Sequence, residues 1–145
     1  MVIFLIIAMS FVVLDRFLKI LALRIESFYL FGDILKFNFV PNFNMAFSLP
    51  FTGLFLNLLI ILIIGFLLAE TIYLFRTRLV YKASILIFIV AGAASNLFDR
   101  LSYGFVIDYF DLKYLTIFNL ADVMIVGGML FLILANNSNQ GVRNG

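Results

Sequence analysis

The side chains that could carry out chemistry in this sequence are almost all carboxylates. The chain contains no Cys and no His, which excludes thiol nucleophiles, Ser-His and Cys-His pairs, disulfides and the usual ligands of zinc and haem. Its eight Asp and Glu residues are left as the main acids and bases. Two carboxylates that share one proton can act together, because the ionised group accepts a proton from water while the neutral group donates one. No metal or cofactor is expected.

Two of these carboxylates, Asp122 and Asp108, each fit two interpretations. Asp122 is the charge at the head of an apolar segment, in Phe118-Asn-Leu-Ala-Asp-Val-Met. A carboxylate in the first turn of a helix is stabilised by the helix dipole, so a capping role explains Asp122 as well as a catalytic one does. Asp108 lies among aromatic and branched residues, where loss of water and a nearby second carboxylate would favour its neutral form. By itself, Asp108 fits an ordinary acidic loop residue better than a catalytic one.

Other polar residues lie near the ends of apolar segments. Asp15 and Lys19 fall toward the end of the first segment, and Asn96, Asp99 and Arg100 end the third. Ionisable groups at membrane depth are costly and usually mark a function or a close partner. Local ion pairing is the simpler explanation for Asp99 and Arg100. The alternative is a scaffold in which Asn96, Asp99 and Arg100 orient the loop that carries Asp108.

The elements that would position these residues are predicted to be membrane helices. Hydrophobic residues make up 65% of the chain and charged residues 12%, against about a quarter charged in soluble domains. Four apolar segments approach the ~20 residues needed to cross a bilayer. The prediction is an all-α integral membrane protein, with transmembrane helices at about 2–23, 53–75, 79–98 and 120–134. Together they form one domain, 1–135, followed by a tail, 136–145, that is predicted to be disordered.

Basic residues predict the orientation of these helices. The turn at 76–82 carries three positive charges and no negative one, and the tail adds Arg143. The positive-inside rule places both in the cytoplasm, together with the two termini. By alternation, segments 24–52 and 99–118 lie outside.

The external segments complete the predicted fold. Residues 28–49 are expected to form a small sheet at the membrane interface, because aromatic residues and partial alternation flank a Gly32-Asp33 turn. A short loop or helix is expected to precede the fourth transmembrane helix. The first segment could instead be a cleaved signal peptide, but no basic residue precedes it and no small-x-small cleavage site follows it. A retained helix is therefore favoured.

Four segments, read together, resemble the lipoprotein signal peptidase (signal peptidase II) family. They occur in the family's order across nearly the whole chain: Leu14-Asp-Arg-Phe-Leu-Lys19, Val40-Pro-Asn-Phe-Asn-Met-Ala-Phe-Ser48, Gly92-Ala-Ala-Ser-Asn-Leu-Phe-Asp-Arg100 with Gly104-Phe-Val-Ile-Asp-Tyr109, and Phe118-Asn-Leu-Ala-Asp122. The resemblance implies an aspartyl endopeptidase of the bacterial cytoplasmic membrane. It would remove signal peptides from diacylglyceryl-modified prolipoproteins, cleaving before the lipidated cysteine.

The resemblance also implies residue roles. Asp108 and Asp122 match the catalytic pair, whereas the supporting positions are Asn42, Asn96, Asp99, Arg100, Asn119, Asp15 and Lys19. Asn44 and Met45 stand where the family usually has Gly and Ala, a departure that concerns the shape of the substrate cleft.

Two alternatives remain beside the protease. One is a small transporter subunit whose aspartates carry protons, although such a protein should spread its acids through the membrane. The other is an inactive relative with a binding role. The expected partners are lipidated prolipoproteins and membrane lipid, with the chain a monomer; no basic run indicates nucleic acid.

Overall fold

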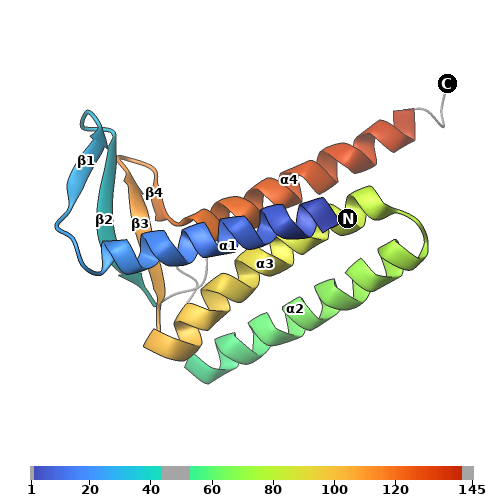
Figure 1. Cartoon of the computed structure of the whole chain (residues 1–145), viewed down its shortest axis with the longest axis horizontal. Coiled ribbons are helices and arrows are strands. Elements are labelled where there is room, and N and C mark those ends of the chain that lie inside the picture. Colours follow the sequence, from blue (N-terminus) through green and yellow to red (C-terminus); the bar gives the residue numbers. More distant parts are fainter. Residues whose placement is uncertain (1, 44–52, 142–145) are drawn as a thin grey trace.

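The computed structural model describes residues 2–43 and 53–141 as four long helices with a small sheet at one end (Figure 1). The helices are α1 (Val2–Ala22), α2 (Gly53–Arg76), α3 (Val80–Tyr103) and α4 (Leu120–Gly141). The strands are β1 (Phe28–Phe31), β2 (Leu35–Asn42), β3 (Val106–Leu112) and β4 (Thr116–Phe118). They form an antiparallel sheet in the order β1-β2-β3-β4. Helix α3 is central, because it contacts α1, α2, α4 and β3.

Helix α1 buries polar residues and exposes apolar ones. Its buried residues are Ala8, Asp15, Lys19 and Ala22, and their spacing places them on one face of the helix. Many of its Ile, Leu, Val and Phe side chains are exposed. Water would disfavour this arrangement, because charged groups prefer solvent and apolar groups avoid it. The surface of α1 is therefore suited to lipid.

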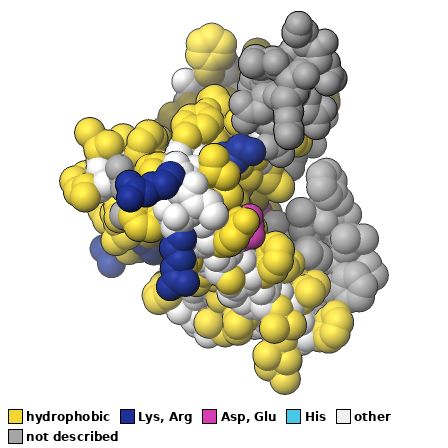
Figure 2. All heavy atoms as spheres, turned by 90° about the vertical axis from the view of Figure 1, so that its right-hand side faces the viewer, with side chains coloured by type: hydrophobic (Ala, Val, Ile, Leu, Met, Phe, Trp, Pro, Cys, Tyr) yellow, Lys and Arg dark blue, Asp and Glu magenta, His cyan; other side chains and the backbone are white. Residues whose placement is uncertain are grey.

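Length and composition single out two helices as candidate membrane spans, α2 and α3. The apolar part of α4, Leu120–Ala135, is shorter, and α1 carries three charges. None of the most apolar stretch of α2 is buried within the protein, so this helix presents a continuous apolar surface. The end of the bundle away from the sheet holds the turn between α2 and α3. Figure 2 faces this end and shows Lys and Arg side chains among hydrophobic ones.

A change of register in the sheet positions Asn42. Phe37 pairs with Phe110 and Val40 pairs with Asp108, so β2 has one more residue than β3 between these pairs. Such a bulge reverses the side-chain alternation of the longer strand. Paired residues of antiparallel strands share a face, and Asn42 lies two residues after Val40. Asn42 therefore shares a face of the sheet with Asp108.

Two predictions differ from the structure. Residues 106–112 and 116–118 form strands where a loop or short helix was expected, and they join β1 and β2 in one sheet. Val106 to Tyr109 are all buried, so this strand lacks the alternation that marks a half-buried one. Helix α3 continues to Tyr103 and ends at Gly104, whose left-handed φ of 82° terminates it. Residues 44–49 of the expected sheet lie outside the described residues.

The tail predicted to be disordered from residue 136 is helical as far as Gly141. Residues 142–145 lie outside the described residues.

Candidate active site

The start of α4 is held by a reciprocal cap between Asn119 and Asp122. The Asp122 backbone N–H donates to Asn119 Oδ1 at 2.9 Å, and the Asn119 backbone N–H donates to Asp122 Oδ2 at 3.2 Å. This is the geometry of a capping box, which satisfies two N–H groups that a helix start leaves unpaired. The capping interpretation of Asp122 therefore fits the structure. Its other oxygen, Oδ1, accepts from Asn96 Nδ2 at 2.7 Å.

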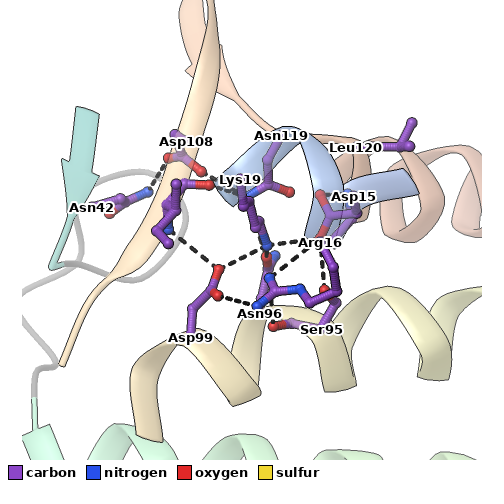
Figure 3. A network of polar contacts seen from close by, with 12 residues as sticks. Asp15, Arg16, Lys19, Asn42, Ser95, Asn96, Asp99, Asp108, Asn119 and Leu120 are labelled. Atoms are coloured by element: carbon purple, nitrogen blue, oxygen red, sulfur yellow. Dashed lines mark hydrogen bonds and ion pairs between the residues drawn. The ribbon is translucent and has the colours of Figure 1, made fainter. Parts of the chain in front are cut away.

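Asp108 lies on β3, with 2% of its surface exposed. Asn42 Nδ2 donates to its Oδ2 at 2.9 Å, and Asn119 Nδ2 donates to its Oδ1 at 2.6 Å. Figure 3 shows Asp108 between these two asparagines. Asn119 thus bonds both carboxylates, through its side chain to Asp108 and through its backbone N–H to Asp122.

The surroundings of Asp108 favour its neutral form. Burial raises the pKa of Asp108 to about 6, and the negative charge of Asp122 contributes in the same direction. Hydrogen bonds from Asn42 and Asn119 and the charge of Lys19 oppose this shift only in part. A pKa near neutrality lets a carboxyl group both hold and release a proton at physiological pH.

A buried network of charges lies beside this pair and connects α1 to α3. Lys19 Nζ contacts Asp15 Oδ2 at 2.9 Å and Asp99 Oδ2 at 2.8 Å. Arg16 Nη1 contacts Asp99 Oδ1 at 2.6 Å, so two cations meet two anions. Lys19 Nζ also donates to Asn96 Oδ1 at 2.9 Å, which joins the network to the carboxylate pair. We call these four residues, Asp15, Arg16, Lys19 and Asp99, the ion network.

Asp15 also supports the start of α4. The Tyr109 hydroxyl donates to Asp15 Oδ1 at 3.0 Å and accepts from the Leu120 N–H at 2.9 Å. The Ala121 N–H donates to the same Asp15 oxygen at 3.3 Å. Burial and the charge of Asp15 raise the pKa of Tyr109, so its hydroxyl remains a donor. Residues of α1 and β3 therefore fix the helix that carries Asp122, which supports a retained first helix.

Asp99 and Arg100 face different partners. Asp99 pairs with Lys19 and Arg16 of α1, and its Oδ2 accepts from the Ile107 N–H at 3.3 Å. Because Ile107 precedes Asp108, this contact favours the scaffold interpretation of Asp99. Arg100 Nη1 donates to the Phe43 carbonyl at 3.4 Å, and the charges of Asp108, Asp122 and Asp99 act on its guanidinium.

The structure gathers the predicted site residues in one region where α1, α3, β2, β3 and the start of α4 meet (Figure 3). Direct contacts connect eight of them: Asp15, Lys19, Asn42, Asn96, Asp99, Asp108, Asn119 and Asp122. Arg100 is close enough for its guanidinium to interact electrostatically with Asp108, Asp122 and Asp99. Asn44 and Met45 lie outside the described residues.

Three residues of the region were not predicted: Arg16, Ser95 and Tyr109. Ser95 Oγ donates to Asp15 Oδ2 at 2.6 Å. Each of the three directly follows or precedes a residue that was predicted, in a segment already singled out. Their position next to a predicted residue was the signal that the sequence offered. It could not show that they contact residues of distant segments.

This arrangement can support acid and base chemistry without a metal. The carboxylates of Asp108 and Asp122 both accept hydrogen bonds from Asn119 and are largely shielded from solvent, and the pKa of Asp108 is raised toward neutrality. Such a pair can hold one proton between two groups, as acid and base catalysis on a carbonyl requires.

The chain is similar to known proteins over most of its length. The family model described as Signal peptidase (SPase) II matches residues 7–137. A lipoprotein signal peptidase of Caldicellulosiruptor bescii is 38% identical, over 93% of this chain and 93% of its own length. One of Halothermothrix orenii is 34% identical, over 89% of this chain and 91% of its own.

The fold also has a counterpart of known structure. A bacterial membrane enzyme solved by the in meso method at 2.3 Å superposes with a TM-score of 0.83, at 22% sequence identity. The match covers 97% of this chain and 90% of that one.

Proposed function

The chain belongs to the signal peptidase II family, aspartic peptidases that remove signal peptides from lipoprotein precursors, and from that premise we propose that Asp108 and Asp122 are its catalytic pair. The substrate is a diacylglyceryl-modified prolipoprotein, cut on the amino side of the lipidated cysteine. The observation that carries the proposal is the bonding of both carboxylates to Asn119.

The reaction follows from one proton held by two carboxylates. The ionised carboxylate removes a proton from water, and the water oxygen bonds to the carbonyl carbon before the cysteine. The protonated carboxyl group gives its proton to the carbonyl oxygen, which forms a neutral tetrahedral intermediate. The carboxyl group that took the proton from water then gives it to the departing nitrogen, while the other carboxylate removes a proton from one hydroxyl group of the intermediate. The C–N bond breaks as the carbonyl re-forms, and each carboxyl group returns to its starting state. The products are a signal peptide with a new carboxylate and a lipoprotein that begins with its lipidated cysteine.

The surface of the helices suits a substrate that arrives through lipid. The outward side of α1 is apolar and its inward side is charged. A signal peptide and a diacylglyceryl group are both apolar, so they can reach the site laterally without leaving the bilayer. We propose that all four helices cross the bacterial cytoplasmic membrane and that the chain acts as a monomer.

The position of the basic turn supports an external active site. Arg76, the last residue of α2, and Arg78, in the turn before α3, are exposed. This turn lies at the end of the bundle away from the sheet (Figure 1), and basic loops remain in the cytoplasm. The sheet, Asp108 and the start of α4 then lie on the outer side, with both termini in the cytoplasm.

A proton-carrying transporter subunit is less well supported. Such a protein needs acids along its membrane depth, whereas Asp15, Asp99, Asp108 and Asp122 gather at the sheet end of the bundle. An inactive relative with a binding role is also less well supported. Both carboxylates of the proposed pair and their asparagine partners are present, so the site lacks none of the groups that the reaction needs.

The test is cleavage of a lipidated prolipoprotein by the purified protein in detergent, beside the same precursor without the lipid. The wild-type chain should cut the lipidated precursor. Asp108→Asn and Asp122→Asn should each lower the single-turnover rate by at least ~10³-fold. The double variant should be no slower than either single one, because residues that act as a unit lose function non-additively.

The matched control is Asp111→Asn, on the same strand as Asp108 but paired with Lys36 in the sheet. It should retain most of the activity. Near wild-type cleavage by a folded Asp108→Asn or Asp122→Asn variant would refute the catalytic pair.

A further inference from the structure

Lys19 is a buried cation whose donors are all used. Its side chain is 1% exposed, and its ammonium reaches three acceptors: Asp15 Oδ2, Asp99 Oδ2 and Asn96 Oδ1. An ammonium has three N–H donors. The first two acceptors are charged and neutralise the lysine. The third is an uncharged amide, so this contact does something other than balance charge.

The contact with Lys19 fixes the orientation of the Asn96 amide. Asn96 Oδ1 accepts from Lys19 Nζ at 2.9 Å and from Asn119 Nδ2 at 3.2 Å. If the Asn96 amide were flipped, its NH₂ group would face the N–H donors of Lys19 and Asn119, and both hydrogen bonds would be lost. The Asn96 NH₂ group must therefore face Asp122 Oδ1, to which it donates at 2.7 Å.

The two catalytic carboxylates consequently receive different support. Asp122 lies in the first turn of α4, where the helix dipole favours negative charge, and it accepts from an amide polarised by a cation. Asp108 lies on a strand, is 2% exposed, and accepts from the side chains of Asn42 and Asn119. Asp122 is the better site for negative charge and Asp108 the better site for the proton.

We propose that Lys19 is a positioning residue that acts through Asn96 to keep Asp122 ionised, which leaves the shared proton on Asp108. Asp122 then activates the water, and Asp108 donates to the carbonyl oxygen. This inference rests on the proposed function and adds to it the division of roles within the pair.

Other ionisable groups near the pair come from every element packed against it. They are Asp15 and Arg16 on α1, Asp99 and Arg100 on α3, and Tyr109 on β3. Arg16 offers a matched control, because it belongs to the same ion network and carries the same charge as Lys19. Its guanidinium bonds Asp99, Asp15 and the Ser95 carbonyl instead of Asn96.

The experiment compares the pH profiles of Lys19→Met and Arg16→Met with that of the wild-type protein, using the lipidated precursor. On the acid side, activity falls as Asp122 takes up a proton. Without Lys19 this fall should begin about one pH unit higher, and kcat should drop about tenfold with little change in KM. Arg16→Met should keep the acid side where the wild-type profile has it.

Two further variants keep the proposal falsifiable. Asn96→Ala should show the shifted acid side by itself, and adding Lys19→Met to it should shift the profile no further. If Lys19→Met fails to fold, the double variant Asp15→Asn/Lys19→Met takes its place in the experiment, because it removes one charge of each sign and keeps the ion network neutral. An equal shift in Arg16→Met, or no shift in the folded variant lacking Lys19, would overturn the proposal.

A second measurement needs no substrate, so it separates this inference from the proposed function. Aspartates labelled with carbon-13 can be titrated by NMR in detergent, with Asp108→Asn and Asp122→Asn identifying the two signals. As the pH rises, Asp122 should lose its proton before Asp108. The reverse order would refute the division of roles, whereas failure to cleave the lipidated precursor would refute the proposed function.

Discussion

Asp122 caps α4 and also belongs to the proposed catalytic pair, although the sequence presented these two roles as alternatives. Its Oδ2 accepts the Asn119 N–H and so caps α4, while its Oδ1 accepts from Asn96. The cap fixes the carboxylate at the helix start, where the dipole stabilises its charge. A residue held in this way is already oriented before substrate arrives, which reduces the reorganisation that catalysis requires.

The two roles of Asp122 can be separated by comparing two substitutions. Asp122→Asn keeps one oxygen that can accept the Asn119 N–H, whereas Asp122→Ala loses the cap. Both should be inactive, but the alanine variant should be less stable by a further ~1 kcal/mol. Thermal unfolding in detergent measures the difference. Equal stability of the two variants would mean that the cap contributes nothing in this protein.

The pKa of Asp108 should respond to the charge of Asp122. Burial is the larger cause of its rise from 3.8 to about 6, and the Asp122 charge is the second. Asp122→Asn removes only the second cause, so the pKa of Asp108 should fall while staying above 3.8. Since the folded value exceeds the unfolded one, the stability contributed by neutral Asp108 is lost as pH rises through about 6. In Asp122→Asn this loss should occur at lower pH.

Titration of the Asp108 carboxyl group by infrared spectroscopy or NMR checks this pKa prediction. Asp111→Asn serves as the control and should leave the pKa unchanged. An unchanged pKa in Asp122→Asn would show that the two carboxylates do not interact.

At the residue scale, short motifs identified the polar groups but not their partners. Asp108, Asn119 and Asp122 could be selected from the sequence only because four segments, read together, resemble one family; each segment alone is a weak signal. The contact between Lys19 and Asn96 could not, since it joins residues 77 positions apart. Tyr109 was missed because a strand directs neighbouring side chains to opposite faces, and the strand itself was not predicted.

At the scale of elements, the distance between α3 and α4 determines whether Asn96 can reach Asp122. A Cβ added at Gly92 would lie 2.6 Å from the Ala121 carbonyl oxygen and 3.1 Å from Met124 Cβ. Asn96 lies one turn after Gly92 on the same face of α3, opposite Asp122. The close approach permitted by Gly92 therefore sets the Asn96 to Asp122 bond, as small residues do between membrane helices.

Gly92→Ala should separate α3 from α4 and lengthen the Asn96 to Asp122 bond. Overpacking of this kind costs about 1–3 kcal/mol, and cleavage should fall at least about tenfold because the carboxylate is displaced. Gly127→Ala is the matched control, because a Cβ at Gly127 meets nothing within 4 Å. Thermal unfolding and single-turnover cleavage measure both effects. Wild-type behaviour of Gly92→Ala would mean that helix spacing does not set this bond.

The elements themselves were predicted unevenly, and the reason is physical. The four helices could be predicted because each contains a long apolar segment that approaches the length needed to cross a bilayer. Strand β3 gives no such signal, since its burial comes from α1 and α3 rather than from its own pattern. The bulge in β2 reverses its alternation, which explains why that segment showed only partial period-two character.

At the scale of the whole molecule, the buried acids gather at one end, and a turn with three basic residues and no acidic one lies at the other. The buried acids lie beneath the sheet, and the exposed basic turn lies at the opposite end (Figures 1 and 2). A membrane supplies two chemically different sides, so this asymmetry predicts a single orientation. The proposed function, cleavage of exported lipoproteins, requires the active site to face outward.

The orientation can be tested directly, because the chain has no cysteine and a single one can be placed at will. Thr77→Cys, in the basic turn, should react with a membrane-impermeant maleimide only after the cytoplasmic side is opened. Tyr103→Cys, at the end of α3, and Tyr114→Cys, at a position 93% exposed between β3 and β4, should react in intact spheroplasts. The physical reason is that a turn with three positive charges resists translocation. Each variant must still cleave lipidated precursor, so that labelling reports the active topology. Labelling of Thr77→Cys from outside, with protection of the other two, would place the carboxylate pair on the side that exported precursors never reach.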